Sequence, residues 1–467
     1  MKMDIPAARY DPRYDPLVAR DPGCNQDYPP SYWAASAGAP PPVDEPVSGD
    51  LDVDVAIIGA GYTGLATAIF LAREHGIRAT VLESHRVGWG CSGRNGGQGQ
   101  YASGRLTRAQ WVARWGLDTA KRMHGEIAAG FHTFSDLVKD VDCDAQPGGH
   151  FLIAHRAKIM KGLAARQAFE RKYFNYDTEL VDAATLRAKY VGDAEAHGAL
   201  HEPQCISVHP MKLVYGYAKL ARELGAKVRP ASPVVGWETR NGVHHLKTPG
   251  GTVRARAVGV ATGGYTSQTL HPQLKNRLMP ILSNNAVTRV LTKDEIAACN
   301  FVTHQALTDT RTLRFYYRFL PDNRLQMGSR SSITGADAPN PEHLEVLTGG
   351  LHRKFPPLRD LGFEYSWWGW VDVSHDMMPR ITQPDPSQTL YYALGYGGNG
   401  VSYSARAGQR MAQRIAGKRD DADLPIFASA LPLPMVLDRF ESNVFAPFRR
   451  IGQRALYGWY YLNDEVL

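Results

Sequence analysis

A short segment near the amino end constrains most strongly what this chain can fold into. Residues 52–61 (DVDVAIIGAG) form an apolar run with β-branched side chains, residues 62–76 (YTGLATAIFLAREHG) suit a helix that ends at a glycine, and residues 78–84 (RATVLES) form a second apolar run. This order predicts a strand, a helix and a second, parallel strand. The turn between the first strand and the helix reads GAGYTG, which is the glycine spacing of a dinucleotide-binding turn.

Each glycine of this turn has its own physical task. Gly59 permits the tight turn, Gly61 lets the backbone approach a pyrophosphate, and Gly64 lets the helix pack closely on the strand. The amino end of the helix supplies free amides and partial positive charge. Glu83 ends the second strand 22 residues after Gly61, the spacing expected of a carboxylate that binds a ribose. A solvated strand end is the alternative for Glu83, and its context favours a bound dinucleotide.

The same segment has a competing interpretation as a membrane span. Residues 55–72 are 18 residues without a charged side chain, which is at the edge of the length that a span needs. Three glycines in the GxGxxG spacing and a β-like first part favour a strand, turn and helix instead, so we expect no membrane partner. Residues 1–16 lack the apolar core of a signal peptide, and the scattered cysteines, which form no CxxC pair, favour a reduced, cytoplasmic setting.

Composition excludes several other classes of protein. The 467 residues are enough for two or more domains, or for one large domain with an insertion. The net charge of +7 suits an acidic ligand or a phosphate, but Lys and Arg are spread along the chain without the block that marks nucleic-acid binding. The five cysteines are far apart and form no CxxC pair, so neither a metal site nor a disulfide framework is expected.

Residues 88–99 (GWGCSGRNGGQG) contain six glycines, each costly in conformational entropy. Such a stretch is either a flexible tether or backbone that lies against something. It follows Glu83 by a few positions. It carries no acidic residue and no proline, whereas a tether between domains would be expected to carry them. Ser92 can bond a phosphate, Arg94 can pair with it, and residues 95–97 can present bare amides to a flat ring. We therefore expect a second contact with an extended dinucleotide.

The rest of the chain continues the alternation of strands and helices. Helical patterns cover 106–143, the charged sequence up to about 190, and 209–228, where His209 reads as a helix-start residue. Strand patterns cover 147–157, 232–264, 314–320 and 324–332. Residues 389–417 repeat the opening order of strand, glycine turn and long helix.

Seven motifs resemble those of the FAD-dependent amine and amino-acid oxidoreductases of the D-amino-acid oxidase superfamily, and most of all its γ-glutamylputrescine oxidase branch. They are PPSYW (29–33), DVAIIGAGYTGLATA (54–68), VLES (81–84), GWGCSGRNGGQ (88–98), VATGGYT (260–266), WGWVDVSHDMMPRI (368–381) and GYGGNGVSYS (395–404). Their order along nearly the whole chain is more specific than any one of them. The resemblance implies an α/β (α+β) fold, in which a Rossmann-type FAD-binding domain carries an inserted substrate domain built on a mostly antiparallel sheet.

This fold divides the chain into four parts. Residues 1–50, rich in Pro, Asp and Tyr, form an extended arm rather than a helix or sheet. The discontinuous FAD-binding domain takes in 51–105, 205–268 and 386–418. The substrate domain takes in 106–204 and 269–385, and 419–467 form a helical extension.

The resemblance also implies which residues contact FAD, position by position. The GAGYTG turn holds the pyrophosphate, Glu83 holds the adenosine ribose, the 92–98 stretch runs past the phosphates to the edge of the flavin ring, and the 398–401 turn meets the pyrimidine end of the ring. The implied residues are Gly59, Gly61, Tyr62, Thr63, Gly64, Glu83, Ser84, Ser92, Gly93, Arg94, Asn95, Gly96, Gly97, Gln98, Ala261, Thr262, Gly263, Gly398, Asn399, Gly400 and Val401.

Two departures from related sarcosine oxidases concern the flavin. Those enzymes attach FAD through a cysteine at the position of Gly369 in this chain, and no cysteine follows Cys299, so we expect FAD to be bound non-covalently. They also use a lysine over the flavin to activate oxygen, where this chain has Gln326. The electron acceptor, O2 or another, therefore stays open.

Candidates for the substrate pocket come from two aromatic stretches. They are Tyr316, Tyr317, Arg318, Gln326, Trp367 and Trp368, with Trp370 beside them. Aromatic walls can hold a cationic amine, and an arginine can pair with a carboxylate. The alternative is that alternate residues of these strands face the core. No catalytic acid–base pair is evident, and His375 and Asp376 are expected to position the backbone near the flavin.

The resemblance implies oxidation of a small-molecule amine, γ-glutamylputrescine or a related polyamine or amino compound. Hydride transfer to flavin N5 would give an imine, water would hydrolyse the imine to an aldehyde, and O2 would reoxidise the flavin. The alternative is a dehydrogenase for amines or amino acids that passes electrons to a quinone or a carrier protein. A third hypothesis, a flavin-binding protein without turnover, is disfavoured by the two intact glycine-rich motifs. The oligomeric state stays open.

Overall fold

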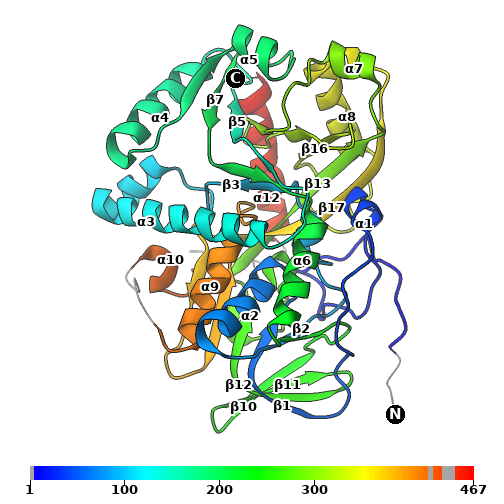
Figure 1. Ribbon diagram of the computed structural model, residues 1–467, viewed down its shortest axis with the longest axis vertical. Coiled ribbons are helices and arrows are strands. Elements are labelled where there is room, and N and C mark those ends of the chain that lie inside the picture. Colours follow the sequence, from blue (N-terminus) through cyan, green and yellow to red (C-terminus); the bar gives the residue numbers. More distant parts are fainter. Residues whose placement is uncertain (1–4, 419–423, 434–447, 467) are drawn as a thin grey trace.

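The computed structural model describes residues 5–418, 424–433 and 448–466. Its architecture is two large sheets, each with its own helices, stacked end to end (Figure 1). The first sheet and its helices fill the lower half of the view, and the second sheet fills the upper half. This is the mixed α/β architecture that the sequence predicted, and that prediction is confirmed.

The first sheet is built around β1 (Leu51–Ile58), which lies between β2 (Thr80–Leu82) and β12 (Gly251–Val260) and runs parallel to both. The second half of β1 is fully buried, as expected of a central parallel strand. The remaining strands of this sheet are β9 (Lys227–Arg229), β10 (Gly236–Arg240), β11 (Val243–Thr248), β18 (Arg380–Thr382) and β19 (Leu390–Leu394).

Four helices accompany the first sheet: α2 (Tyr62–His75), α3 (Arg108–Lys139), α6 (Pro210–Glu223) and α9 (Tyr403–Ile415). Helix α2 ends at Gly76, whose φ of 65° provides the left-handed cap that the sequence indicated. His209 caps α6, since its Nδ1 accepts from the Lys212 amide at 3.2 Å. The interpretation of His209 as a helix-start residue is confirmed.

The long helix α3 is joined to α9 by a buried ionic cluster. Glu126 accepts hydrogen bonds from Arg406 and from Arg410, and its carboxylate lies 2.6 Å from the nearer Arg410 nitrogen. These arginines hold the pKa of Glu126 below its usual value, although burial alone would raise it. Helix α3 therefore packs on the first sheet's helices, although its residues belong to the predicted substrate domain.

The second sheet runs in the order β17-β13-β16-β15-β14-β5-β7-β6 and is antiparallel except between β14 and β5. Its strands are β5 (His150–Ile153), β6 (Glu179–Asp182), β7 (Gly198–Glu202), β13 (Leu278–Thr288), β14 (Ala306–Asp309), β15 (Tyr316–Phe319), β16 (Leu325–Ser329) and β17 (Phe363–Ser374). Its helices are α4 (Ile159–Phe174), α5 (Ala183–Lys189), α7 (Lys293–Ala298) and α8 (Glu342–Lys354). A small third sheet joins β3 (Gln98–Gln100), β8 (Cys205–Ser207) and β4 (Gln146–Pro147).

The sheet topology bears on where the domains divide. Strand β18, inside the predicted substrate range 269–385, pairs with β19 of the first sheet. We therefore propose that the FAD-binding domain starts its last segment before Arg380 and also takes in α3, with the other predicted boundaries kept.

The amino-terminal arm is extended for most of its length, but Tyr32–Ser36 form a short helix, α1, which corrects the expectation of no helix there. The Ser31 hydroxyl caps it by accepting from the Ala34 amide. The Trp33 side chain is 1% exposed and donates to the carbonyl of Asn95 at 2.9 Å. The arm is thus part of the packed core.

The predicted carboxy-terminal extension, 419–467, is described in part. It contains α10 (Pro425–Ala428), α12 (Phe448–Tyr461) and the π-helical turn η6 (Leu462–Val466), while 419–423, 434–447 and 467 lie outside the described residues. Asp464 in η6 accepts from the Thr312 amide at 2.6 Å, so this segment holds the loop before β15. None of the described helices has both the length and the apolar composition of a membrane span.

Candidate active site

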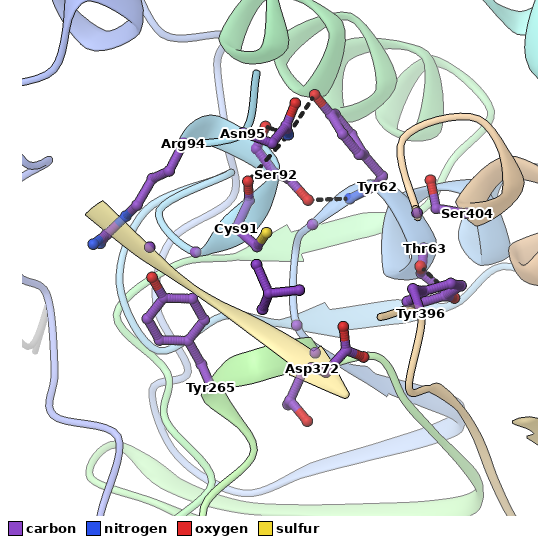
Figure 2. Close-up of a pocket in the computed structure, with 18 of the residues that line it drawn as sticks. Tyr62, Thr63, Cys91, Ser92, Arg94, Asn95, Tyr265, Asp372, Tyr396 and Ser404 are labelled. Atoms are coloured by element: carbon purple, nitrogen blue, oxygen red, sulfur yellow. Dashed lines mark hydrogen bonds between the residues drawn. The ribbon is translucent and has the colours of Figure 1, made fainter. Parts of the chain in front are cut away.

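A large cavity lies between the two sheets, at the carboxyl ends of the parallel strands of the first. Its walls include the turn after β1, the glycine-rich stretch, the turn before α9, and part of the second sheet. Figure 2 shows Tyr62, Ser92, Asn95, Asp372 and Tyr396 gathered around it. Eighteen of the residues predicted to contact FAD line the cavity, and Gly64, Gly93 and Gly97 do not.

The turn after β1 has the shape that its glycines predicted. Gly59 has a φ of +106°, and a Cβ atom there would lie 2.7 Å from the Ala261 carbonyl oxygen. A Cβ on Gly64 would lie 2.0 Å from the Gly59 carbonyl oxygen, so a side chain there would push α2 away from β1. Gly64 therefore shapes the cavity from behind, as the close-packing role requires.

Glu83 lies at the end of β2 with its carboxylate directed back at the turn. Its Oε2 accepts from the Ala60 amide at 2.8 Å, and its Oε1 accepts from the His85 amide at 2.9 Å. Burial raises the pKa of Glu83, and these backbone bonds partly offset the effect. Glu83 therefore fixes the shape of the turn from a position on the cavity wall.

The glycine-rich stretch is fastened to the start of α2 (Figure 2). The hydroxyl oxygen of Ser92 accepts from the Tyr62 amide at 2.9 Å. The Asn95 amide group donates to the carbonyls of Cys91 and Ser92, and its Oδ1 accepts from Gly97. These bonds make the stretch a fixed loop, which favours the prediction of close backbone approach over a flexible tether.

The surroundings of Arg94 give it a structural role, and its predicted contact with a phosphate stays a prediction. The side chain is 3% exposed, and its guanidinium lies over the rings of Tyr10, Trp89 and Tyr265, with 4.2 Å to the Trp89 ring. Its Nε donates to the Trp89 carbonyl at 2.8 Å. Arg94 lines the cavity, but its guanidinium lies in this aromatic cage, so we interpret it as a residue that holds the loop.

Gly93 and Gly97 do not line the cavity, and neighbouring backbone leaves no room for a Cβ atom at either position. A Cβ on Gly93 would lie 2.3 Å from the Gly88 carbonyl oxygen, and one on Gly97 would lie 2.2 Å from that of Val208. They support the loop by close packing rather than by lining the cavity.

The turn before α9 forms the opposite wall. Tyr396 is 7% exposed, and its hydroxyl shares a hydrogen bond of 2.9 Å with Thr63 at the start of α2. The Asn399 amide group donates to the Gly104 carbonyl, which ties the turn to the loop after β3. Gly398, Asn399, Gly400 and Val401 all line the cavity at the amino end of α9. This end of a helix suits a ligand with negative charge.

Of the predicted substrate residues, only Tyr316 lines the cavity. Its ring fills space that two glycines leave, since a Cβ on Gly96 would lie 2.9 Å from it and one on Gly328 only 2.2 Å. Its hydroxyl bonds Ser283 at 2.8 Å. Tyr316 thus connects the second sheet to the glycine-rich stretch.

The placement of Tyr317 and Arg318 corrects their prediction as pocket residues. Strand alternation turns Tyr317 to the opposite face of the sheet, where its hydroxyl bonds the buried Asp193. Arg318 lies on the same face of the sheet as Tyr316, but its side chain is only 1% exposed. Its guanidinium nitrogens donate to the Gly96 carbonyl, the Gln146 side chain and the Val208 carbonyl. It is a structural brace for the glycine-rich stretch.

The two tryptophans and Gln326 are also placed off the cavity. Trp367 is 2% exposed and donates to the Arg94 carbonyl at 2.8 Å, while Trp368 donates to the Pro12 carbonyl. Gln326 is fully buried and donates to Asn285 Oδ1 at 2.9 Å. Trp370 likewise donates to the Tyr14 carbonyl. Packing explains these side chains, which was the alternative stated for them.

The structure adds charged residues to the site that were not among the predicted site residues. They are Asp372, Arg105, Arg314 and Arg330, all on the cavity wall. Asp372 accepts from the Gly395 amide at 2.6 Å and so fixes the start of the turn before α9. Their sequence positions carry no regular spacing, and the positive net charge of the chain was the one signal for the arginines.

Burial raises the pKa of Asp372 to about 6. Because the folded state favours the protonated acid, its ionisation destabilises the fold as pH rises from about 4 to about 6, the window between the unfolded and folded pKa values. Asp372→Asn should therefore gain thermal stability relative to the natural chain as pH rises through that window. Thermal unfolding midpoints of both proteins at pH 4, 5, 6 and 8 test this. A difference that is independent of pH would contradict it.

The cavity fits the FAD that the sequence implies. Glu83, the amides at the start of α2 and the turn before α9 present acceptors, donors and bare backbone along one continuous wall. Of the described residues on that wall, Cys91 is the one cysteine, and burial raises the pKa of its thiol to about 12, which keeps it protonated and a poor nucleophile.

Flavin should therefore leave the protein on acid or heat denaturation. Gly369, on the cavity wall, offers no sulfur for attachment. Ultrafiltration of the denatured protein followed by absorbance of both fractions measures this. Flavin that stays with the washed chain would contradict it.

Comparison with known proteins places this geometry in a family. The sequence model described as FAD dependent oxidoreductase matches residues 54–414. The gamma-glutamylputrescine oxidoreductase of Escherichia coli (strain K12) is 32% identical over 439 residues, which cover 93% of this chain and 98% of that protein. The sarcosine oxidase subunit beta of an Arthrobacter species is 25% identical, over 84% of this chain and 91% of that protein. The crystal structure of glycine oxidase from Geobacillus kaustophilus superposes with a TM-score of 0.68 at 19% identity, covering 81% of this chain and 98% of that one.

Proposed function

Because the chain belongs to the FAD dependent oxidoreductase family, we propose that it oxidises the carbon–nitrogen bond of an amine, with γ-glutamylputrescine as the substrate. The observation that carries this proposal is the near full-length similarity to a gamma-glutamylputrescine oxidoreductase, together with a cavity that reaches from the dinucleotide turn to the second sheet. The sarcosine oxidase subunit among the relatives supports the broader class of amine substrates.

In this proposal the residues of the chain bind and orient the reactants. The GAGYTG turn, Glu83 and the start of α9 hold the cofactor, which when bound supplies the acceptor for a hydride. Tyr316, braced by Ser283, forms the wall of the cavity on the side of the second sheet, where the substrate would lie.

Anaerobic mixing with γ-glutamylputrescine tests the proposal. We expect the flavin absorbance of the purified protein to bleach with saturable dependence on the amine. Putrescine, sarcosine and glycine serve as comparison amines. If none of these compounds reduces the flavin, the proposed amine chemistry is wrong, and if only glycine or sarcosine does, the substrate is wrong.

Gln326→Lys should accelerate the reaction of the reduced flavin with oxygen. Gln326 lies close behind Gly96, since its Nε2 would be 3.6 Å from a Cβ there, and an ammonium at this point would stabilise superoxide electrostatically. A gain of roughly tenfold or more is expected for this one charge. Stopped-flow reoxidation of the pre-reduced protein measures it, with Gln326→Met as the uncharged control. Equal rates in the lysine and methionine variants would contradict the role.

A further inference from the structure

Three arginines meet at the end of the cavity that lies against the second sheet. Strand β15 pairs Tyr316 with Gly328 of β16, so the same register continued by two residues sets Arg314 opposite Arg330. Both are thereby on the face of the sheet that carries Tyr316, and both line the cavity. Arg105 joins them from the loop after β3.

Within the described part of the chain, these guanidinium groups have no carboxylate at ion-pair distance. No described residue forms an ion pair with Arg105, Arg314 or Arg330, and the Nε atoms of Arg314 and Arg330 are buried without a hydrogen-bond partner. Arg105 has one described acceptor, the Gly397 carbonyl at 3.3 Å. A buried donor without an acceptor is costly, so such a cluster indicates a ligand that supplies acceptors.

The three positive charges also act on one another. Repulsion from Arg330 is the main cause that lowers the pKa of Arg105, with burial and Arg314 adding to it. Burial first, and then Arg330, lowers the pKa of Arg314 to about 10. Like charges held together in a cavity are stabilised by an anion placed among them.

The position of the cluster separates it from the cofactor's phosphates. The amides for a pyrophosphate lie at the start of α2 on the first sheet, whereas Arg314 and Arg330 belong to the second. The terminal nitrogen of Arg330 lies 2.8 Å from where a Cβ of Gly398 would be, so the cluster adjoins the turn that faces the flavin ring in the proposed complex. An anion held by this cluster would therefore lie near the flavin ring, away from the cofactor's phosphates.

We propose that Arg105, Arg314 and Arg330 form a subsite that holds a carboxylate of the amine substrate, so that the enzyme selects amines that also carry a carboxylate over free polyamines. This inference rests on the proposed function. A planar carboxylate accepts paired hydrogen bonds from guanidinium groups, while the extra ammonium groups of a polyamine would be repelled. Of the aromatic side chains predicted to hold a polyamine, only Tyr316 lines the cavity. Tyr317, Trp367 and Trp370 are buried elsewhere in the fold, and Trp368 is half-buried off the cavity.

The test compares two amines that differ only in the carboxylate. γ-Glutamylputrescine has one, and 4-aminobutanoylputrescine lacks it. Arg314→Met should raise the γ-glutamylputrescine concentration that gives half-maximal anaerobic flavin reduction by roughly 10- to 100-fold. The corresponding concentration of 4-aminobutanoylputrescine should change little, because only γ-glutamylputrescine loses a charge-assisted hydrogen bond. Arg314→Lys should recover part of the loss.

Thermal stability separates a binding role from a structural one. Removing one of three repelling charges should leave the unfolding midpoint of Arg314→Met unchanged or higher, with full FAD occupancy. Arg318→Met is the matched contrast, since all its described bonds are structural, and it should lower the midpoint and affect both amines equally. Equal losses for both amines in Arg314→Met, or lost FAD, would overturn the inference.

One probe keeps this inference distinct from the proposed function. γ-Glutamyl-n-butylamide carries the carboxylate but no terminal amine, and its binding is read from the change in flavin absorbance. If no amine reduces the flavin but this probe binds the natural chain and binds Arg314→Met at least tenfold more weakly, the amine chemistry fails and the subsite stands. If the probe does not bind, or binds both proteins equally, the subsite is wrong.

Discussion

Glu83→Lys should abolish FAD binding by the folded protein. The natural carboxylate accepts from the amides of Ala60 and His85, which fixes the turn between β1 and α2. Each such charge-assisted bond contributes about 1.5–3 kcal/mol, and a lysine has no acceptor to replace them. Its ammonium would also lie buried at the positive amino end of α2. The affinity for FAD should fall by roughly 100-fold or more.

The ratio of flavin to protein absorbance after purification, and titration of the flavin-free protein with FAD, measure this loss. Glu83→Gln is the matched control, because its amide oxygen still accepts one of the two bonds and adds no charge. We expect it to keep an intermediate affinity. Near full flavin content in Glu83→Lys would mean that the end of β2 does not form the cofactor site.

Lys354→Met should cause the largest loss of stability. Lys354 on α8 is fully buried, and its Nζ lies 3.4 Å from Asp193, 3.2 Å from Glu195 and 3.3 Å from Asp309. Arg311 also pairs with Glu195 and Asp309, but Asp193 would keep only the Tyr317 hydroxyl and backbone contacts. Removing one member of a buried ionic cluster costs about 3–5 kcal/mol.

Equilibrium unfolding in urea, followed by circular dichroism, measures the free energy lost. Lys139→Met is the control, since Lys139 pairs with Asp136 at 2.8 Å but both side chains are more than 70% exposed. Such a surface pair contributes at most about 1 kcal/mol. If the two variants lose the same stability, the buried cluster does not stabilise the second sheet.

Local patterns in the sequence predicted the parts of the fold that depend on neighbouring residues. The strand, turn and helix at 51–75 and the cap at His209 are determined within a few positions, and both are confirmed. Strand β6 (Glu179–Asp182) lies inside a stretch that the pattern predicted as helical. Its four residues are too few for a period to show, and its pairing with β7 decides its conformation.

The aromatic candidates show where a strand pattern falls short. The alternation of RFYYRFL predicts two faces but not which of them borders the cavity. Register with β16 places Tyr316 toward Gly328 and the glycine-rich stretch, and it places Tyr317 toward Asp193. That choice depends on residues more than 100 positions away in the chain.

The charged residues of the cavity depend on distant contacts in the same way. Arg105, Arg314 and Arg330 come from two loops and a strand end, and no spacing relates them. Asp372 lies inside a motif that resembles one of the family's motifs, yet its contact with the Gly395 amide is visible only in the folded protein. Net charge was the only property of the sequence that pointed toward these three arginines.

The central place of β1 in the first sheet has a consequence for the newly made chain. One edge of β1 pairs with β2, which follows closely, but the other edge pairs along its length with β12, which begins at Gly251. At about 5–20 residues per second, roughly 10–40 s of translation separate β1 from that partner. During this interval an apolar strand has an open edge, which is the feature that pairs with other chains. We therefore expect this edge to be shielded during synthesis, by a chaperone or by transient packing, until β12 completes the sheet that carries the cofactor site.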